Sequence, residues 1–113
     1  MKSKFKTKDS GTRKFYDTGM IRDTRSGKVR FDLCWYPMLR RWAELMMRGA
    51  DKYGENNWQF AKTGEEHDRF VESALRHLYQ WAHGEDPEED HAAAVFFNIA
   101  SAEYTKERMN RKR

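Results

Sequence analysis

The sequence is poor in features that fix a chain covalently or insert it into a membrane. Its single cysteine, Cys34, cannot form an intramolecular disulfide. No apolar run approaches the roughly 20 residues of a membrane-spanning helix. The basic stretch at residues 1–8 is not followed by the apolar core of a signal peptide. These absences predict a cytoplasmic protein that has no membrane partner.

Proline is almost as scarce, and both prolines precede helical patterns. After Pro37, an apolar stripe recurs at helical spacing and should end near Gly54. A second stripe lies between a candidate N-cap at Asp68 and a candidate C-cap at Gly84. The acidic segment Pro87–Asp90 is expected to open a third helix. The two stripes consist of Leu39, Trp42, Met46, Ala50 and Tyr53, and of Phe70, Ala74, Leu78 and Trp81.

The composition allows these helices only a modest core, because 38% of the 113 residues are hydrophobic and 35% are charged. The four tryptophans, five tyrosines and seven phenylalanines carry more apolar area than one short chain can cover. The predicted fold is all-α, a compact bundle of three main helices with an irregular N-terminal extension. We expect oligomerisation to complete it, as a dimer or tetramer packed through Trp42, Met46 or Phe96.

Charge is distributed unevenly along the chain. Residues 1–30 contain ten basic and three acidic residues, and residues 104–113 contain five basic residues and one acidic residue. The segment between them contains seven basic and fourteen acidic residues. We therefore predict a basic flexible tail at 1–16, a helical domain at 17–104 and a second basic tail at 105–113. The tails either attract phosphates or are simply solvated. A nucleic acid partner is not expected, because the acidic middle would repel a duplex.

The turn after the first helix is rich in side chains that can contact a ligand. Asn57 can hydrogen-bond the edge of a base, and Trp58 or Tyr53 can stack on its face. Lys52 can bind a phosphate. The alternative is a plain helix end at which Trp58 fills the core.

Polar residues also interrupt the apolar faces of the second and third helices. His77 lies on the apolar line of the second helix, and His91 and Asn98 share one face of the third. A buried polar group without a partner costs roughly 1–3 kcal/mol, so each of these residues needs a partner. The partner is either a neighbouring side chain or a ligand, whose phosphates Arg69 and Arg76 could hold.

Four carboxylates could bind a metal: Glu72 on the second helix, and Glu85, Asp86 and Asp90 near the following turn. Mg²⁺ takes a few carboxylates together with water and substrate phosphates. However, Glu85 follows Glu72 by nearly four helical turns, about 20 Å, so one chain is not expected to bring both to one ion. The alternatives are an ordinary i,i+4 pair of Glu72 with Arg76, and acids that only complement a helix dipole.

Six short motifs, in this order, resemble one known family. They are Gly27–Leu33, Gly49–Gly54, Asn57-Trp58, Arg76-His77-Leu78 with Trp81, Gly84-Glu85-Asp86, and the pair His91 and Asn98. Together they span about residues 17–102. They are similar to the dATP/dGTP diphosphohydrolase N-terminal family, which is common in bacteriophages and resembles the all-α MazG-type nucleotide pyrophosphohydrolases.

The resemblance implies a phage-type enzyme, in the host cytoplasm if phage-encoded. It would hydrolyse purine (deoxy)nucleoside triphosphates to monophosphate and pyrophosphate with Mg²⁺ or Mn²⁺. The residues assigned to this site are Glu72 and His77 for catalysis; Lys52, Tyr53, Asn57, Trp58, Arg69, Arg76, His91 and Asn98 for the nucleotide; and Glu72, Glu85, Asp86 and Asp90 for the metal.

The sequence departs from the MazG-type metal motif, which is E-x-x-E on one helix and E-x-x-D on the next. Leu75 stands three residues after Glu72, and Ala94 stands where members often carry a second histidine. Nucleotide binding survives this departure better than hydrolysis does. The alternative hypothesis is therefore a non-catalytic binder that sequesters a nucleotide, for example a signalling nucleotide of host defence.

Overall fold

The computed structural model describes residues 5–111, and this chain divides into two compact units between Cys34 and Trp35. Within the described range, no helix combines the length and the apolar character needed to cross a membrane. The outer ends of the two predicted tails, residues 1–4 and 112–113, lie outside the described residues.

The unit before Trp35 contains a small antiparallel hairpin. Strand β1 (Arg13–Phe15) pairs with strand β2 (Ile21–Asp23), and a 3₁₀ turn, η1 (Phe31–Leu33), follows. Gly19, in the connecting turn, has a φ of 96°, which glycine adopts without strain. Outside these elements, the described residues of this unit are irregular, as predicted. The two strands were not predicted, because strands of three residues are too short to show an alternating pattern.

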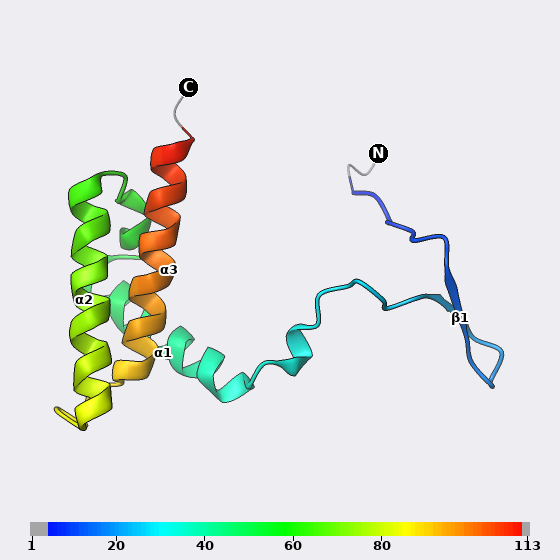
Figure 1. Ribbon diagram of the computed structural model, residues 1–113, viewed down its shortest axis with the longest axis horizontal. Helices are drawn as coiled ribbons and strands as arrows, with labels where there is room; N and C mark the ends of the chain where they lie inside the picture. The colour runs from blue at the N-terminus through cyan, green and yellow to red at the C-terminus, as the bar shows by residue number, and fades with distance from the viewer. Residues whose placement is uncertain (1–4, 112–113) are drawn as a thin grey trace. The chain divides into compact units, whose positions relative to one another are not determined.

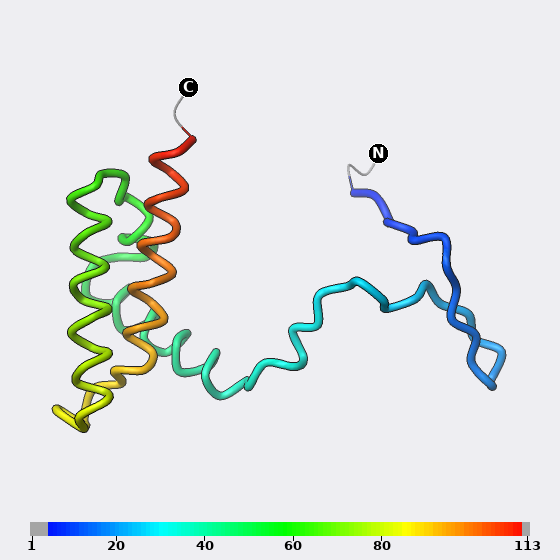
Figure 2. Tube along the Cα trace, viewed as in Figure 1, coloured from blue at the N-terminus to red at the C-terminus, as the bar shows by residue number. Residues whose placement is uncertain are grey.

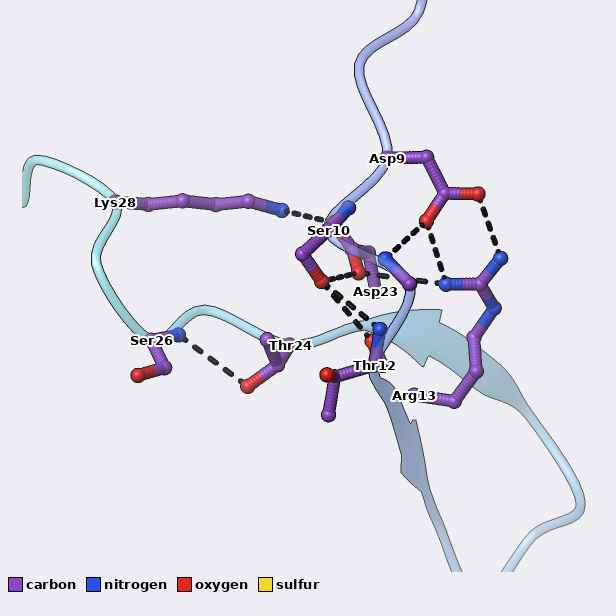
Figure 3. A network of polar contacts seen from close by, with 9 residues as sticks. Asp9, Ser10, Thr12, Arg13, Asp23, Thr24, Ser26 and Lys28 are labelled. Atoms are coloured by element: carbon purple, nitrogen blue, oxygen red, sulfur yellow. Dashed lines mark hydrogen bonds and ion pairs between the residues drawn. The ribbon is translucent and has the colours of Figure 1, made fainter.

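Asp23 is the centre of a polar network in this hairpin (Figure 3). Its carboxylate accepts hydrogen bonds from the backbone N–H and the hydroxyl of Ser10 and from Lys28 Nζ. Arg13 forms a bidentate ion pair with Asp9, at 2.7 and 2.8 Å. The bonds from Ser10 and Lys28 hold the pKa of Asp23 well below its usual range, and those from Arg13 lower the pKa of Asp9 to about 2.

The second unit is a bundle of three long helices, which confirms the all-α prediction (Figure 1). Helix α1 spans Tyr36–Tyr53, α2 spans Gly64–His83 and α3 spans His91–Asn110, with the short 3₁₀ helix η2 (Asn57–Phe60) between α1 and α2 in the chain. Helices α2 and α3 run side by side in opposite directions, joined by the turn at residues 84–90 (Figure 2). Because α1 and η2 also contact α3, α3 is the central helix.

Two predicted helix starts were wrong. Helix α2 begins after Thr63, whose hydroxyl accepts from the N–H of Glu66 while the Glu66 carboxylate accepts from the N–H of Thr63. This capping box leaves Asp68 inside the helix. Helix α3 begins after Asp90, which is its N-cap, so residues 87–90 form a turn and do not open the helix. Where several acidic or hydroxyl residues follow one another, the sequence does not show which of them caps the helix.

Regular structure also extends into both segments that were predicted to be basic tails. Strand β1 begins within 1–16, and α3 continues through 105–110. Near the end of α3, Arg108 Nη1 donates to the carbonyl oxygens of Gln59 and Ala61, at 2.6 and 3.2 Å. Composition indicates the basic charge of this segment but not its bonds to residues far away in the chain.

The core along α3 is small and largely polar. Among the described residues, every buried hydrophobic residue is an alanine, and the buried polar residues are His77, His91, Asn98, Ser101 and Thr105. On α2, Ala74 is buried as predicted, but Leu78 and Trp81 are 43% and 59% exposed. Small side chains bring α2 and α3 close together, so the larger apolar residues beside the contact remain outside it.

Candidate functional site

A cavity of about 1040 Å³ lies in the helical unit, lined by the second half of α1, the turn after it, α2 and α3. Its apolar wall includes Met46, Phe70 and Phe97, and the rings of Phe70 and Phe97 meet edge to face at 6.1 Å. The volume is at the upper end of the range for small-molecule sites, roughly 300–1,000 Å³. The cavity is therefore large enough for a nucleotide.

Most of the site residues chosen from the sequence line this cavity: Lys52, Tyr53, Asn57, Trp58, Arg69, His77, Asp90 and Asn98. Glu72, Arg76, Glu85, Asp86 and His91 do not line it. Arg76 donates instead to Gln80 Oε1 at 3.3 Å, and Glu72 lies 3.8 Å from Arg69 on the exposed side of α2. The two arginines of α2 thus differ in position, and of the two only Arg69 lines this cavity.

Three cationic side chains line the cavity: Arg48, Lys52 and Arg69. Arg69 Nη1 donates to Ser73 Oγ at 3.0 Å, and Lys52 Nζ lies 5.1 Å from the ring centre of Tyr53. Within the described residues, Arg48 and Lys52 form no salt bridge. Arg48 was not among the predicted site residues, because the helical period assigns it to the solvent face of α1 and does not show that a cavity extends over that face.

The aromatic side of the cavity is formed by η2. Trp58 is half-buried and meets Tyr104 of α3 edge to face at 5.0 Å. The bonds from Arg108 to the backbone of Gln59 and Ala61 fix η2 on α3. Trp58 therefore packs against the core and lines the cavity at once, so the two roles considered from the sequence are compatible.

Asn98 presents an acceptor to the cavity. Its Nδ2 donates to the Ala94 carbonyl oxygen at 2.8 Å, and this carbonyl can only accept, which fixes the orientation of the amide. Within the described residues, its Oδ1 has no partner, and Asn98 lines the cavity. The predicted polar residue on α3 is therefore only half satisfied by the protein, and it leaves one acceptor for a ligand.

His77 and His91 form a buried pair between α2 and α3. Their Nδ1 atoms are 2.9 Å apart, and His91 Nε2 lies 2.8 and 2.9 Å from the carbonyl oxygens of Glu85 and Asp86. Because carbonyls only accept, His91 Nε2 carries a proton and donates it. Burial, followed by the charge of Arg76, lowers the pKa of His77, so its imidazole is held neutral.

Glu89 joins this pair on the cavity side. One ligand atom each from His77, Glu89 and His91 lie within 4.8 Å of one another, and within residues 5–111 this is the one group of three or more such side chains close enough to hold an ion. His77 and Glu89 both line the large cavity, whereas His91 lines a neighbouring cavity of about 400 Å³ that also includes Glu89. Glu89 lies in the same acidic turn as Glu85, Asp86 and Asp90 but was not one of the four carboxylates assigned to the metal.

The four carboxylates chosen for Mg²⁺ do not meet in the described part of one chain. Both oxygens of Asp90 are bonded to Arg41, at 2.7 and 2.8 Å, and Asp86 accepts from Gln80 Nε2 at 3.2 Å. Glu72 is on the exposed side of α2, away from the turn at residues 84–90. The donor set therefore does not fit a Mg²⁺ site within one chain.

Residues 18–112 of the chain match the family model described as dATP/dGTP diphosphohydrolase, N-terminal. Neither the curated proteins nor the solved structures contain a match to the chain. The match covers the whole of α1, η2, α2 and α3, and so includes every residue that lines the cavity.

Proposed function

Because the chain belongs to the dATP/dGTP diphosphohydrolase N-terminal family, we propose that it binds a purine deoxynucleoside triphosphate in the large cavity and hydrolyses it to monophosphate and pyrophosphate. The observation that carries this proposal is the composition of the cavity wall. Cations from α1 and α2, aromatic rings from η2 and α1, and the free acceptor of Asn98 face one space. A nucleotide has a complementary group for each of them.

The triphosphate would bind along the cationic side. Arg69 offers a planar fork for phosphate oxygens. Lys52 and Arg48 supply further positive charge, and within the described residues neither forms a salt bridge that phosphate binding would have to break. A hydrogen bond to a charged group contributes about 1.5–3 kcal/mol. The phosphates therefore account for much of the expected affinity.

The base would bind on the η2 side of the cavity. Trp58 is held in place by Tyr104, so little freedom is lost when a ring packs on it. Asn57 follows the αL residue Asn56 and offers both a donor and an acceptor to a base edge. Asn98 Oδ1 can accept from an exocyclic amino group or a sugar hydroxyl.

His77 and Glu89 lie together at the α2–α3 side of the cavity. In the metal-free protein we assign to them the holding and orienting of the attacking water, because Nε2 of the neutral His77 imidazole and the Glu89 carboxylate can both accept from it. His77 keeps the catalytic role expected from the sequence. Glu72 lies outside the cavity, so a catalytic role for it needs a second copy of the chain.

The second candidate function is nucleotide sequestration. It is favoured by one observation, the separation of Glu72, Glu85, Asp86 and Asp90, because the cavity keeps its cations and rings while the expected Mg²⁺ ligands are dispersed. A protein that only sequesters a nucleotide needs the cations and the rings but not the Mg²⁺ ligands.

One experiment separates the two functions. The protein is incubated with dATP and dGTP, each with and without Mg²⁺ or Mn²⁺, and both bound nucleotide and released pyrophosphate are measured. Pyrophosphate release supports the enzyme. Nucleotide that is retained and recovered unchanged after denaturation supports the binder, and a chain that neither retains nor converts either nucleotide contradicts both functions.

A further inference from the structure

We propose that His77, Glu89 and His91 form a binding site for one divalent transition metal ion of the zinc class. The three side chains come from α2, the following turn and the first residue of α3, and one potential ligand atom from each lies within 4.8 Å of the others. This inference concerns the metal alone, so it holds whether the chain hydrolyses or sequesters a nucleotide.

The spacing of the two imidazoles suits a metal. Zinc binds histidine nitrogen at about 2.0–2.1 Å, so two histidine nitrogens on one tetrahedral ion are about 3.3 Å apart. The Nδ1 atoms of His77 and His91 are 2.9 Å apart. Both side chains are buried in the α2–α3 contact, which holds them at this spacing. Little rearrangement is therefore needed for both Nδ1 atoms to bind the same ion.

The surroundings of His91 fix the tautomer that a metal ligand needs. Its Nε2–H donates to the backbone carbonyls of Glu85 and Asp86, so the lone pair of the neutral ring is on Nδ1. Histidines that bind metals commonly donate their other ring N–H to a carbonyl in this way. Asp86 has a φ of 44°, which is unusual outside glycine. This conformation belongs to the turn that aims both carbonyls at His91.

His77 can change its tautomer without losing another bond. In the metal-free protein its Nδ1–H donates to Nδ1 of His91, whereas a metal ligand needs a lone pair there. Its Nε2 has no partner within the described residues and can carry the proton instead. Metal binding therefore replaces one hydrogen bond by two metal–nitrogen bonds and leaves the charge of the pair unchanged.

The donor set selects the type of metal. Two imidazoles and one carboxylate suit Zn²⁺ or Co²⁺, whereas Mg²⁺ prefers an all-oxygen environment. Three protein ligands leave a coordination position open, as in sites where zinc polarises a bound water. Because His77 and Glu89 also line the large cavity, a ligand in that cavity lies next to the site.

The test uses untagged full-length protein with Cys34→Ser, which removes its one thiol, after treatment with a chelator and without nucleotide. Titration with Co²⁺ should give visible absorption that saturates at one ion per chain, is displaced by one equivalent of Zn²⁺ and persists in millimolar Mg²⁺. Absence of this absorption, or displacement by millimolar Mg²⁺, would overturn the proposal.

Matched variants locate the ion. Glu89→Gln should weaken Co²⁺ binding at least tenfold, whereas Glu88→Gln, at the adjacent acid, should leave it unchanged. His77→Asn should abolish the visible band, and His83→Asn on the exposed end of α2 should not. Glu89 is exposed, so its variant remains informative if His77→Asn fails to fold. Equal effects of the two glutamates, or loss of the band with His83→Asn, would contradict the assignment.

Discussion

The guanidinium of Arg41 on α1 holds the carboxylate of Asp90 with hydrogen bonds of 2.7 and 2.8 Å. The same carboxylate accepts from the N–H of Ala93 at 3.1 Å and so caps α3. One side chain thus joins α1 to the start of the central helix. This use also explains why Asp90, although it lines the cavity, is a poor candidate for a metal ligand.

Replacing Asp90 should destabilise the helical unit. Loss of an N-cap costs about 1 kcal/mol. Loss of a bond to a charged group costs about 1.5–3 kcal/mol, and less here because the Arg41 side chain is 41% exposed to solvent. Asp90→Ala should therefore lower the free energy of unfolding by about 2–3 kcal/mol. Asp90→Asn, which keeps a capping acceptor, should lose roughly 1 kcal/mol less. Urea unfolding followed by circular dichroism measures both. An Asp90→Ala variant as stable as Glu88→Ala would show that the contact contributes nothing.

The two arginines of α2 should differ in nucleotide binding. Arg69→Ala should weaken the binding of dATP or dGTP about tenfold or more, because one charged hydrogen bond contributes about 1.5–3 kcal/mol. Arg76→Ala should change affinity less than twofold, since Arg76 contacts Gln80 and does not line the cavity. Isothermal titration of both variants with dATP or dGTP measures the two affinities. A larger loss for Arg76→Ala would place the nucleotide on the other side of α2.

Asn98 should contribute an ordinary neutral hydrogen bond to the ligand. Asn98→Ala removes the free Oδ1 acceptor, and a neutral hydrogen bond contributes about 0.5–1.5 kcal/mol. We therefore expect a twofold to tenfold loss of nucleotide affinity, measured beside a thermal unfolding curve. Unchanged affinity would mean that this acceptor does not face the bound nucleotide.

The N-terminal hairpin should lose its polar network in acid. The pKa of Asp9 is lowered from 3.8 to about 2 and that of Asp23 is lowered further, because donors hold their ionised forms. Both contacts are therefore complete above about pH 4 and are lost as the pH falls through these lowered values. Carboxyl and amide NMR shifts of Asp9, Asp23 and Ser10 follow this change.

A neutral variant provides the control for the hairpin. Asp23→Asn should abolish the protection of the Ser10 amide at every pH, since an amide oxygen is a weaker acceptor than a carboxylate. Asp17→Asn alters a carboxylate in the turn of the same hairpin that forms no ion pair within the described residues, and it should leave the network intact. Equal effects of the two variants would contradict the central role of Asp23.

Helix α2 should bind a second copy of the chain. Val71, Leu75 and Leu78 follow one another at spacings of four and three on its surface, and all three are exposed in the single chain. By contrast, Trp42, which we expected at the interface, meets Phe96 of the same chain edge to face at 6.2 Å and is half-buried. We therefore propose that the α2 stripe is buried in a dimer or tetramer.

Sedimentation at micromolar concentration tests this association. The unmodified chain should sediment as a dimer or tetramer, and Leu75→Glu should shift it to a monomer because a buried charge is costly. Arg76→Glu introduces the same side chain at the neighbouring position of α2 and should have a smaller effect. A monomeric mass for the unmodified chain would contradict the prediction.

The helical unit and its family could be predicted from the sequence alone. Periodic apolar residues predicted three helices, because a helix needs one apolar stripe to pack and this requirement is local. The sequence also predicted that His77, His91 and Asn98 would be inside, since each stands among apolar neighbours at helical spacing. Six motifs in order indicated the family whose model matches residues 18–112.

Which polar groups meet depends on how the helices pack and could not be predicted from the sequence. Helical spacing assigns Arg69 and Arg76 to a face but not to a cavity, and the packing of α1, η2 and α3 determines that Arg69 lines it and Arg76 does not. The acidic turn offers several carboxylates in succession, and their directions depend on the backbone at Asp86 and on the capture of Asp90 by Arg41. Those interactions join residues far apart in the chain, so no local pattern could show that Glu89 is the acid beside the two histidines.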